Sequence, residues 1–126
     1  MIKNLIITCL LGALAIILGA FGAHALKETL TAAQLLSFET AVRYQMYHVI
    51  VLLFVNTFSG FSLKQKNYIS YLFFLGVFCF SGSIYLIQLT SITAKSIWFI
   101  TPLGGLFFII GWILMIVYFS SKKSFN

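Results

Sequence analysis

Charged side chains are scarce in this chain. Only 8% of its 126 residues are charged, and only two of these are acidic, whereas soluble domains typically carry about 25% charged residues. Hydrophobic residues make up 61% of the sequence, and a soluble domain of this length would leave too much of that apolar surface exposed. The composition therefore indicates an integral membrane protein that forms one domain, residues 1–126.

Cysteine and catalytic motifs are also scarce. The two cysteines, Cys9 and Cys79, lie inside apolar runs and form no C-x-x-C motif. We therefore interpret them as small buried hydrophobic side chains and not as a disulfide or a redox site. The sequence contains neither a nucleophile elbow nor an H-E-x-x-H motif, so nothing in it supports a hydrolytic enzyme. We favour a non-enzymatic protein with no catalytic residues, no metal site and no cofactor.

Four long apolar runs account for most of the chain: residues 5–23, 42–61, 68–89 and 102–119. Each approaches the ~20 residues that a helix needs to cross a bilayer, and at this length only helices satisfy their own backbone in lipid. The sequence therefore predicts an all-α fold, a bundle of four transmembrane helices. The alternative for the first run is a signal peptide, but the run is longer than the apolar core of such peptides. We expect it to be retained.

Two motifs predict where helices begin. Thr31 and Gln34 have the spacing of a capping box, which predicts that the second helix starts before its apolar run. Its first turns form a short amphipathic lead-in near the interface, which either bends into the spanning segment or runs straight into it. Thr101 followed by Pro102 predicts the N-cap and the first residue of the fourth helix.

The net charge of +6 is spread along the chain and not gathered on one face, which indicates that nucleic acid is not a partner. With four spans, both termini share one side of the membrane. That side carries five basic residues and the other carries three: Lys3, Lys64, Lys66, Lys122 and Lys123 against Lys27, Arg43 and Lys95. The positive-inside rule then predicts cytoplasmic termini in a bacterial inner membrane.

The most unusual segment is residues 43–48, where a cation, two phenols, an amide and an imidazole open an apolar run. Ionisable groups at membrane depth are rare and face a partner, a cavity or a ligand. The topology brings further polar residues to the same leaflet, opposite the termini, while the other half of the bundle is nearly apolar. We predict an outward-facing ligand-binding site that comprises His24, Glu39, Arg43, Tyr44, Tyr47, His48, Ser83, Tyr85 and Thr101. Within it, the spacing of Glu39 and Arg43 predicts an ion pair.

Small residues recur along the predicted helices. On the first they are Gly12, Ala15, Gly19, Gly22 and Ala23, and on the third and fourth they include Gly76, Gly104 and Gly111. Small residues let helix backbones approach closely in lipid. We therefore interpret these positions as packing contacts between helices.

Several segments together carry a family resemblance. They are residues 19–27 (GAFGAHALK), 40–48 (TAVRYQMYH), 81–85 (SGSIY), 101–105 (TPLGG) and 111–112 (GW). With these segments the chain resembles the small bacterial membrane proteins of domain of unknown function family 423, which have eukaryotic transmembrane relatives. The resemblance extends over nearly the whole chain, and its first two motifs are specific. It implies a four-helix integral membrane protein and brings no established activity, substrate or cofactor.

The preferred functional hypothesis is a small membrane binding or accessory protein. Arg43, His24 and the start of the fourth helix would hold an anionic group such as a lipid phosphate, because Arg and helix N-termini both favour anions. This class includes a subunit of a larger membrane complex and a homo-oligomer.

Three alternatives use the same polar residues. A small transporter or proton-conducting oligomer would use Glu39, Arg43 and His48. A redox protein would hold haem between His24 and His48. A hydrolase would use Ser83 as a nucleophile beside His48, or a metal held by His24, His48 and Glu39.

Overall fold

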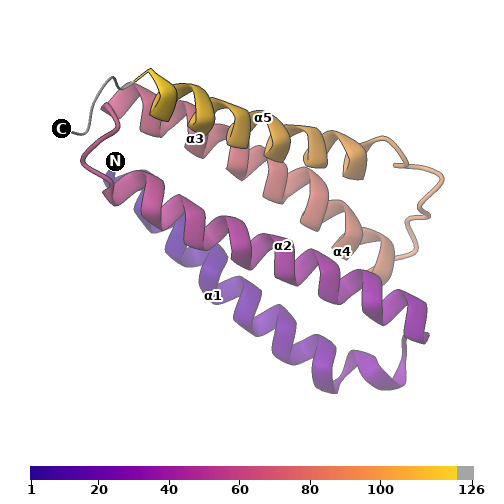
Figure 1. Ribbon diagram of the computed structural model, residues 1–126. Helices are drawn as coiled ribbons and strands as arrows, with labels where there is room; N and C mark the ends of the chain where they lie inside the picture. The colour runs from indigo at the N-terminus through magenta and orange to yellow at the C-terminus, as the bar shows by residue number, and fades with distance from the viewer. Residues whose placement is uncertain (122–126) are drawn as a thin grey trace.

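A computed structural model describes residues 1–121, whose regular structure is entirely helical. In chain order the elements are α1 (Ile2–His24), the 3-10 turn η1 (Leu26–Glu28), α2 (Ala32–Thr57), α3 (Leu63–Gly76), the π-helical turn η2 (Val77–Ser81), α4 (Gly82–Leu89) and α5 (Ile100–Ser120). α3, η2 and α4 follow one another without a break and form one long helical stretch (Figure 1). The predicted all-α bundle is therefore confirmed. Lys122 and Lys123, which contribute to the predicted orientation, lie outside the described residues.

Within residues 1–121, three helical stretches are long and apolar enough to cross a membrane: Ile2–His24, Leu63–Leu89 and Ile100–Ser120. α2 is too polar to be counted with them, yet its 26 residues run antiparallel to α1. Gly22 of α1 faces Phe38 near one end of α2, and Asn4 bonds to Asn56 near the other. α2 therefore extends over the same depth as α1.

The second helix begins at the predicted capping box. Thr31 Oγ1 accepts a hydrogen bond from the backbone N–H of Gln34, and the Thr31 N–H donates to Gln34 Oε1 at 2.9 Å. From there α2 continues without interruption to Thr57, so the lead-in is the first part of the spanning helix itself. The predicted run extended to residue 61, but the chain turns at residues 58–62 because Ser62 and Gln65 form a second capping box that starts α3.

The predicted start of the fourth helix is wrong by two residues. α5 begins at Ile100, with Phe99 at the N-cap position and no side-chain cap. The turns through residues 94–99 lead directly into the helix, and the Leu103 N–H already bonds to the Phe99 carbonyl. Thr101 is therefore inside the helix, where its hydroxyl bonds to Ser83 of α4 instead of capping.

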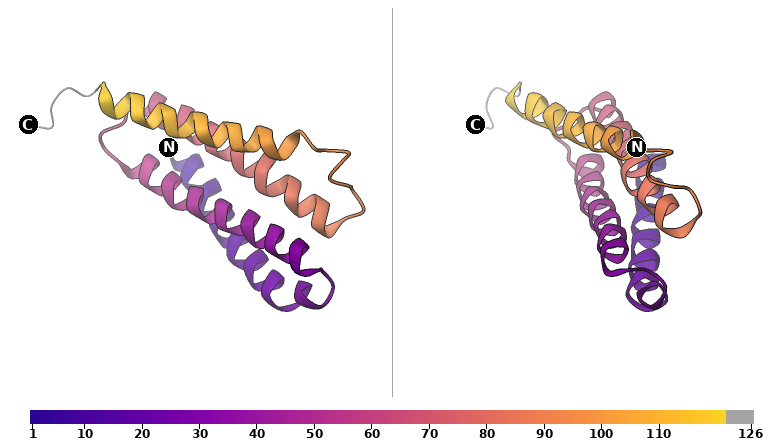
Figure 2. Two further views of the ribbon diagram at one scale, coloured as in Figure 1. Left: turned by 45° about the vertical axis from the view of Figure 1, so that its right-hand side comes forward. Right: turned by 90° about the vertical axis from the view of Figure 1, so that its right-hand side faces the viewer.

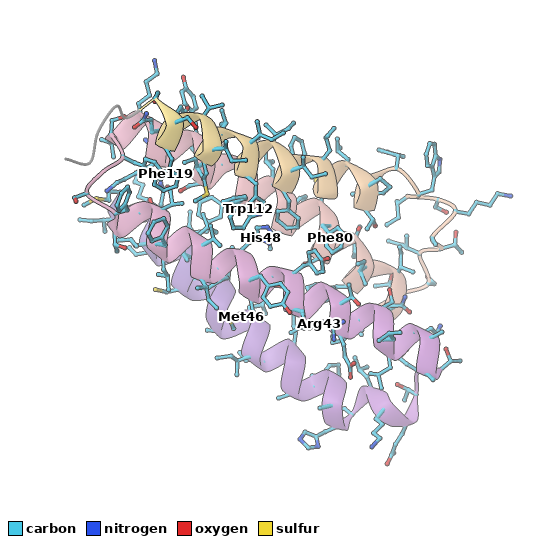
Figure 3. All side chains as sticks on the ribbon, viewed as in Figure 1. Arg43, Met46, His48, Phe80, Trp112 and Phe119 are labelled. Atoms are coloured by element: carbon cyan, nitrogen blue, oxygen red, sulfur yellow. The ribbon has the colours of Figure 1, made fainter. Side chains whose placement is uncertain are left out.

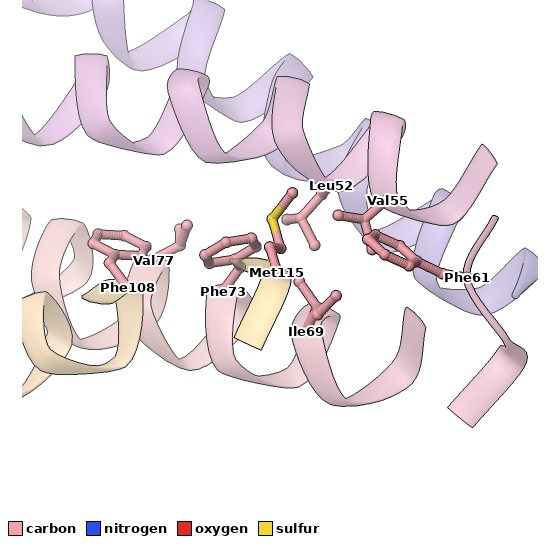
Figure 4. Packing of buried hydrophobic residues seen from close by; sticks show 8 residues of the cluster. All are labelled: Leu52, Val55, Phe61, Ile69, Phe73, Val77, Phe108 and Met115. Carbon is pink, nitrogen blue, oxygen red and sulfur yellow. The ribbon is translucent and has the colours of Figure 1, made fainter. Parts of the chain in front are cut away.

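The helices form two hairpins, α1 with α2 and the α3–α4 stretch with α5, which meet through α2 (Figures 1 and 2). Between them lies a cluster of buried apolar side chains: Leu52, Val55, Phe61, Ile69, Phe73, Val77, Phe108 and Met115 (Figure 4). Both the start of α1 and the end of α5 lie at one end of this bundle (Figure 1). The cluster occupies the half of the bundle nearer to that end.

Small residues bring the helices together, as predicted for most of them. Gly12, Gly19 and Gly22 face side chains of α2, and Ala15 is buried. Ala23 is exposed and does not belong to this contact. Gly76, Gly104 and Gly111 receive aromatic residues of neighbouring helices: Phe108, Phe80 and Phe73 respectively.

The cysteines differ from the prediction. Cys9 lies exposed on α1 and Cys79 is half-buried in η2, so they are not two buried side chains. Asn4, Thr8 and Ala15 occupy the inward side of α1, which leaves Cys9 on the outward side. The two thiols are far apart in sequence and belong to different helices, α1 and η2.

α5 packs against η2 at Gly104 without room for a side chain. A methyl group at Gly104 would collide with the backbone of Phe80, whereas the same group at Gly105 meets nothing within 4 Å. We expect Gly104→Ala to destabilise the protein by about 1–3 kcal/mol because backbone cannot yield as a side chain does. Gly105→Ala should leave stability unchanged or raise it by up to about 1 kcal/mol, because Ala is the better helix former.

Thermal unfolding of both variants in detergent, followed by circular dichroism, measures the difference. Equal melting temperatures for Gly104→Ala and Gly105→Ala would contradict the close contact between η2 and α5.

Candidate functional site

His48 lies at the centre of the bundle, on the side of α2 that faces α5 (Figure 3). Its ring stacks on Phe108 with centroids 3.6 Å apart and planes within 7°. Trp112 Nε1–H donates to His48 Nε2 at 3.2 Å, and His48 Nδ1 lies 2.7 Å from the Tyr44 carbonyl oxygen. Because Nε2 accepts from an indole that can only donate, Nδ1 carries the proton and donates to Tyr44. His48 is therefore a neutral, fully bonded packing residue.

Gln45 joins three helices. Its amide is 1% exposed, and its Nε2 donates to the Leu11 carbonyl of α1 at 2.8 Å. The Tyr85 hydroxyl of α4 donates to Gln45 Oε1, also at 2.8 Å. A buried amide without partners is costly in an apolar interior. Tyr85 therefore serves the interior of the bundle, where the sequence had predicted a ligand contact.

Two serines extend this polar core. Ser81 Oγ donates to the Ala41 carbonyl at 2.7 Å, which joins η2 to α2. The Ser83 hydroxyl bonds to Thr101 of α5 and to the Phe80 carbonyl. Four of the nine predicted site residues thus point inward and have their polar atoms bonded: His48, Ser83, Tyr85 and Thr101.

Four other predicted residues lie on the outside of the protein: His24, Glu39, Arg43 and Tyr47. The predicted Glu39–Arg43 ion pair is absent from the described part of the chain. Arg43 Nη2 donates instead to Thr40 Oγ1 at 3.2 Å. Thr40 is one turn nearer to the start of α2, so the guanidinium bends toward that end of the helix and away from the middle of the bundle.

Tyr44 connects the two groups. Its side chain is 41% exposed, and its ring packs on Phe80 with centroids 5.0 Å apart. It also lies parallel to the His48 ring at 6.5 Å and contacts Tyr47 at 5.9 Å. The predicted single site is therefore a packed polar core and a separate exposed face, with Tyr44 between them.

The two histidines do not meet. Gly22 faces Phe38 and Gly12 faces Val49, so the antiparallel register places His24 level with about residue 36 of α2. His48 is then roughly 18 Å further along the helix axis, at 1.5 Å per residue. The structure therefore does not form the His24–His48 arrangement on which the haem hypothesis depended.

The hydrolytic arrangements are not formed either. The Ser83 hydroxyl bonds to Thr101 and Phe80, while both nitrogens of His48 are occupied by other partners. Within residues 1–121 no group of three His, Cys, Asp or Glu side chains is placed to hold a metal ion.

A second polar cluster was missed by the sequence analysis, at the end of the bundle where α1 begins. Asn4 Nδ2 donates to Asn56 Oδ1 at 3.1 Å and to Asn67 Oδ1 at 2.9 Å. Asn56 Nδ2 in turn donates to Ser70 Oγ at 2.8 Å. Lys66 is only 7% exposed, and its Nζ donates to the Asn56 carbonyl near the end of α2. The prediction that this half of the bundle is nearly apolar is therefore wrong.

The signal for that cluster was present in the sequence. Asn4, Asn56 and Asn67 each lie within a few residues of the same end of consecutive antiparallel helices. Three amides at one depth can satisfy one another, whereas each alone would be costly in lipid.

A family described as "Protein of unknown function (DUF423)" matches residues 18–105. This chain belongs to that family. The matched region of DUF423 includes the polar core and the exposed face around Arg43, whereas Asn4 and Trp112 lie outside it.

Relatives of the chain are membrane proteins by name. It is 43% identical over 99 residues to a UPF0382 membrane protein of Staphylococcus saprophyticus, which covers 79% of this chain and 81% of the relative. It is 44% identical over 99 residues to UPF0382 membrane proteins of Staphylococcus aureus and Staphylococcus haemolyticus, with 79% of this chain and 80% of each relative covered. No solved structure matches the chain significantly. The protein is thus a membrane protein of a family whose function is unknown.

The second prediction concerns the Gln45–Tyr85 bond. We expect Tyr85→Phe to cost about 1 kcal/mol of stability, because it leaves the buried Gln45 oxygen without its donor. A double-mutant cycle with Gln45→Leu should give a coupling energy of about 0.5–1.5 kcal/mol. Tyr47→Phe is the matched control, since the Tyr47 ring is exposed.

Urea or thermal unfolding in detergent gives these values. A coupling energy near zero would mean that the Gln45–Tyr85 bond does not hold α2 to α4.

Proposed function

We propose that this protein is a small, non-enzymatic membrane binding protein that holds an anionic lipid at the exposed face of α2. The observation that carries the proposal is Arg43. Arg43 is exposed on the outside of a helix that runs at membrane depth, and its guanidinium donates to the Thr40 hydroxyl and not to a carboxylate. A guanidinium in that position favours a phosphate, which it can bind with two parallel hydrogen bonds.

The depth of Arg43 fits a lipid headgroup. Gly19 faces Val42, so Arg43 is level with about Leu18 of α1 and roughly 9 Å from the end of that helix at His24. A long Arg side chain can extend over this distance to reach the interface. The bond to Thr40 directs the guanidinium toward that interface and leaves its other donors available.

The neighbouring phenols fit the same role. Tyr44 and Tyr47 flank Arg43, and Tyr47 is 54% exposed. Tyrosine rings are enriched where the apolar and headgroup regions of a bilayer meet. Arg43, Tyr44 and Tyr47 would therefore bind the phosphate and the glycerol region of one lipid. A partner subunit or a second copy of the chain that offers a carboxylate is the alternative occupant of this face.

A transporter or proton-conducting oligomer is less well supported. It would need a polar path from His48 to the asparagine cluster at the other end. Leu52 and Phe73 are fully buried between the two, and both belong to the apolar cluster between the hairpins. Within one chain, that path is filled by apolar side chains.

For location, we infer the bacterial inner membrane with both termini in the cytoplasm. Three lysines lie at the end of the bundle where α1 begins: Lys3, Lys64 and Lys66. Both acidic residues, Glu28 and Glu39, lie in the half near the opposite end. In the sequence, Lys122 and Lys123 follow α5, so with four spans this side carries five basic residues against three, Lys27, Arg43 and Lys95, on the other. The positive-inside rule counts these basic residues and favours cytoplasmic termini.

The lipid site is tested by native mass spectrometry after gentle extraction. We expect Arg43→Gln to lower the retention of anionic phospholipid by about five- to tenfold, because one cation near an anionic surface contributes about 1 kcal/mol. Lys27→Gln removes a charge from the same end and should leave retention unchanged. Arg43→Lys should retain an intermediate amount, since it keeps the charge but loses the paired donors.

Unchanged lipid retention in Arg43→Gln would remove Arg43 from the site. Loss of a co-purifying protein instead of a lipid would assign the face to a partner subunit.

The orientation has its own test. In a background with Cys9 and Cys79 replaced by Ala, Lys95→Cys should react with a membrane-impermeant maleimide on intact cells. Lys64→Cys should react only after the cells are permeabilised, because it lies at the end that we place in the cytoplasm. The reverse pattern would invert the topology.

A further inference from the structure

We propose that a groove between α1 and the α3–η2 segment binds an acyl chain of an anionic phospholipid, whose headgroup is held by Lys3 and Lys64. This site lies at the opposite end of the protein from Arg43 and does not depend on it. The groove has a volume of about 470 Å³, within the range of small-molecule sites. Its walls are apolar and include Ile7, Leu11, Tyr71, Phe74, Leu75 and Phe78.

The groove results from how the hairpins meet. α1 packs mainly on α2, and α3 packs mainly on α5, so α2 is the principal contact between the two hairpins. α1 and α3 are joined at the end where α1 begins by the bond from Asn4 to Asn67. Beyond that bond they are separated by the groove, which no other helix of the described chain fills. In a bilayer, such a lateral groove is open to the acyl chains of one leaflet.

Each helix that contributes a wall of this groove carries a lysine before the lining residues. Lys3 precedes Ile7 by four residues on α1, and Lys64 precedes Tyr68 and Tyr71 by four and seven residues on α3. These spacings place each lysine on the same helix face as the lining residues that follow it. Side chains lean toward the start of their helix, and both helices start at this end, so both lysines lean toward the headgroup region.

Tyr68 helps to define the Lys64 side of the site. The Lys64 Nζ lies 5.8 Å from the centroid of the Tyr68 ring, a cation–π distance that keeps the ammonium over this face. Lys66 does not take part, because it is buried and bonds to the Asn56 carbonyl. The ammonium groups of Lys3 and Lys64 are thus available to a lipid headgroup, whereas that of Lys66 bonds to the interior of the bundle.

Charge decides the class of lipid. Both glutamates of the chain, Glu28 and Glu39, lie in the half near the other end, so no described carboxylate neutralises Lys3 or Lys64 at the groove. A headgroup with net negative charge is complementary to this pair, and a zwitterionic headgroup is less so.

The same features disfavour a second copy of this chain in the groove. The chain carries a net charge of +6, so a second copy would bring further basic residues to the end of the groove near Lys3 and Lys64. Helices that associate in lipid also use small residues at the contact. Here Gly12, Gly19 and Gly22 are turned toward α2, and the groove is lined by large side chains.

The role of Lys3 and Lys64 in lipid selection is tested with protein reconstituted in nanodiscs of equal parts phosphatidylglycerol and phosphatidylethanolamine. The retained lipids are then identified by native mass spectrometry. We expect the wild-type protein to retain phosphatidylglycerol preferentially. The double variant Lys3→Gln/Lys64→Gln should lower that preference about thirtyfold, since each of the two lysines contributes about 1 kcal/mol near an anionic headgroup. Lys27→Gln/Lys95→Gln removes the same charge from the other end and should retain the wild-type preference.

The groove is tested separately, without a change in charge. Leu75→Trp should fill it and reduce the retained phosphatidylglycerol, while Ile109→Trp, on an exposed position of α5 outside the groove, should not. Melting temperatures close to the wild-type value in all variants establish that each one is folded.

Three results would overturn the proposal. They are equal retention in the two lysine double variants, equal retention of the two lipids by the wild-type protein, and dimers in place of bound lipid. Because the Arg43 site would also hold an anionic phospholipid, the two lysine double variants are compared in an Arg43→Gln background, where the lipid that remains is the one in the groove. Failure here and failure of the Arg43 site then produce different patterns. The triple variant with Arg43→Gln, Lys3→Gln and Lys64→Gln should lose both lipids.

Discussion

The side-chain hydrogen bonds of α2 hold the rest of this bundle together. In lipid no hydrophobic effect draws helices together, so association depends on close packing and on bonds between polar groups. Gln45 bonds to α1 and α4, His48 receives a bond from α5, and Asn56 bonds to α1 and α3. The polarity that makes α2 the least typical membrane helix is therefore explained by its central position. The buried amides and the imidazole need no water-filled cavity to account for them.

Much of the fold could be predicted from local sequence. The features that could not be predicted depend on bonds between residues that are far apart in the chain. The capping box at Thr31 specifies the start of α2 because its bonds are made within one turn. Thr101 has an equally good local signal, yet its hydroxyl bonds to Ser83 of another helix. A residue whose partner is distant in sequence cannot be assigned from its own neighbourhood. The asparagine cluster is the same case, since its members are far apart in the chain.

The candidate site shows the same limit more sharply. The sequence predicted that the unusual polar residues share one leaflet, but the leaflet alone does not say which side of a helix a residue occupies. Gln45 and His48 turn inward, while Glu39 and Arg43 turn outward, because only one side of α2 meets other helices. The helical period alone separates these two sets of residues onto different sides of α2. Which of those sides faces the other helices became known only from the packing. The inward polar side chains bond α2 to its neighbours, and the outward ones are exposed.

The π turn η2 has a consequence for how the bundle tolerates change. A π turn contains one residue more than an α-helical turn, and one residue corresponds to about 100° of rotation about the helix axis. The side chains of α4, from Gly82 to Leu89, are therefore rotated about the helix axis relative to those of α3, compared with an uninterrupted α-helix. In that setting the Tyr85 hydroxyl reaches Gln45. Losing a single residue from Val77–Ser81 would swing Tyr85 away from the interior, so the length of this segment matters as much as the identity of its side chains.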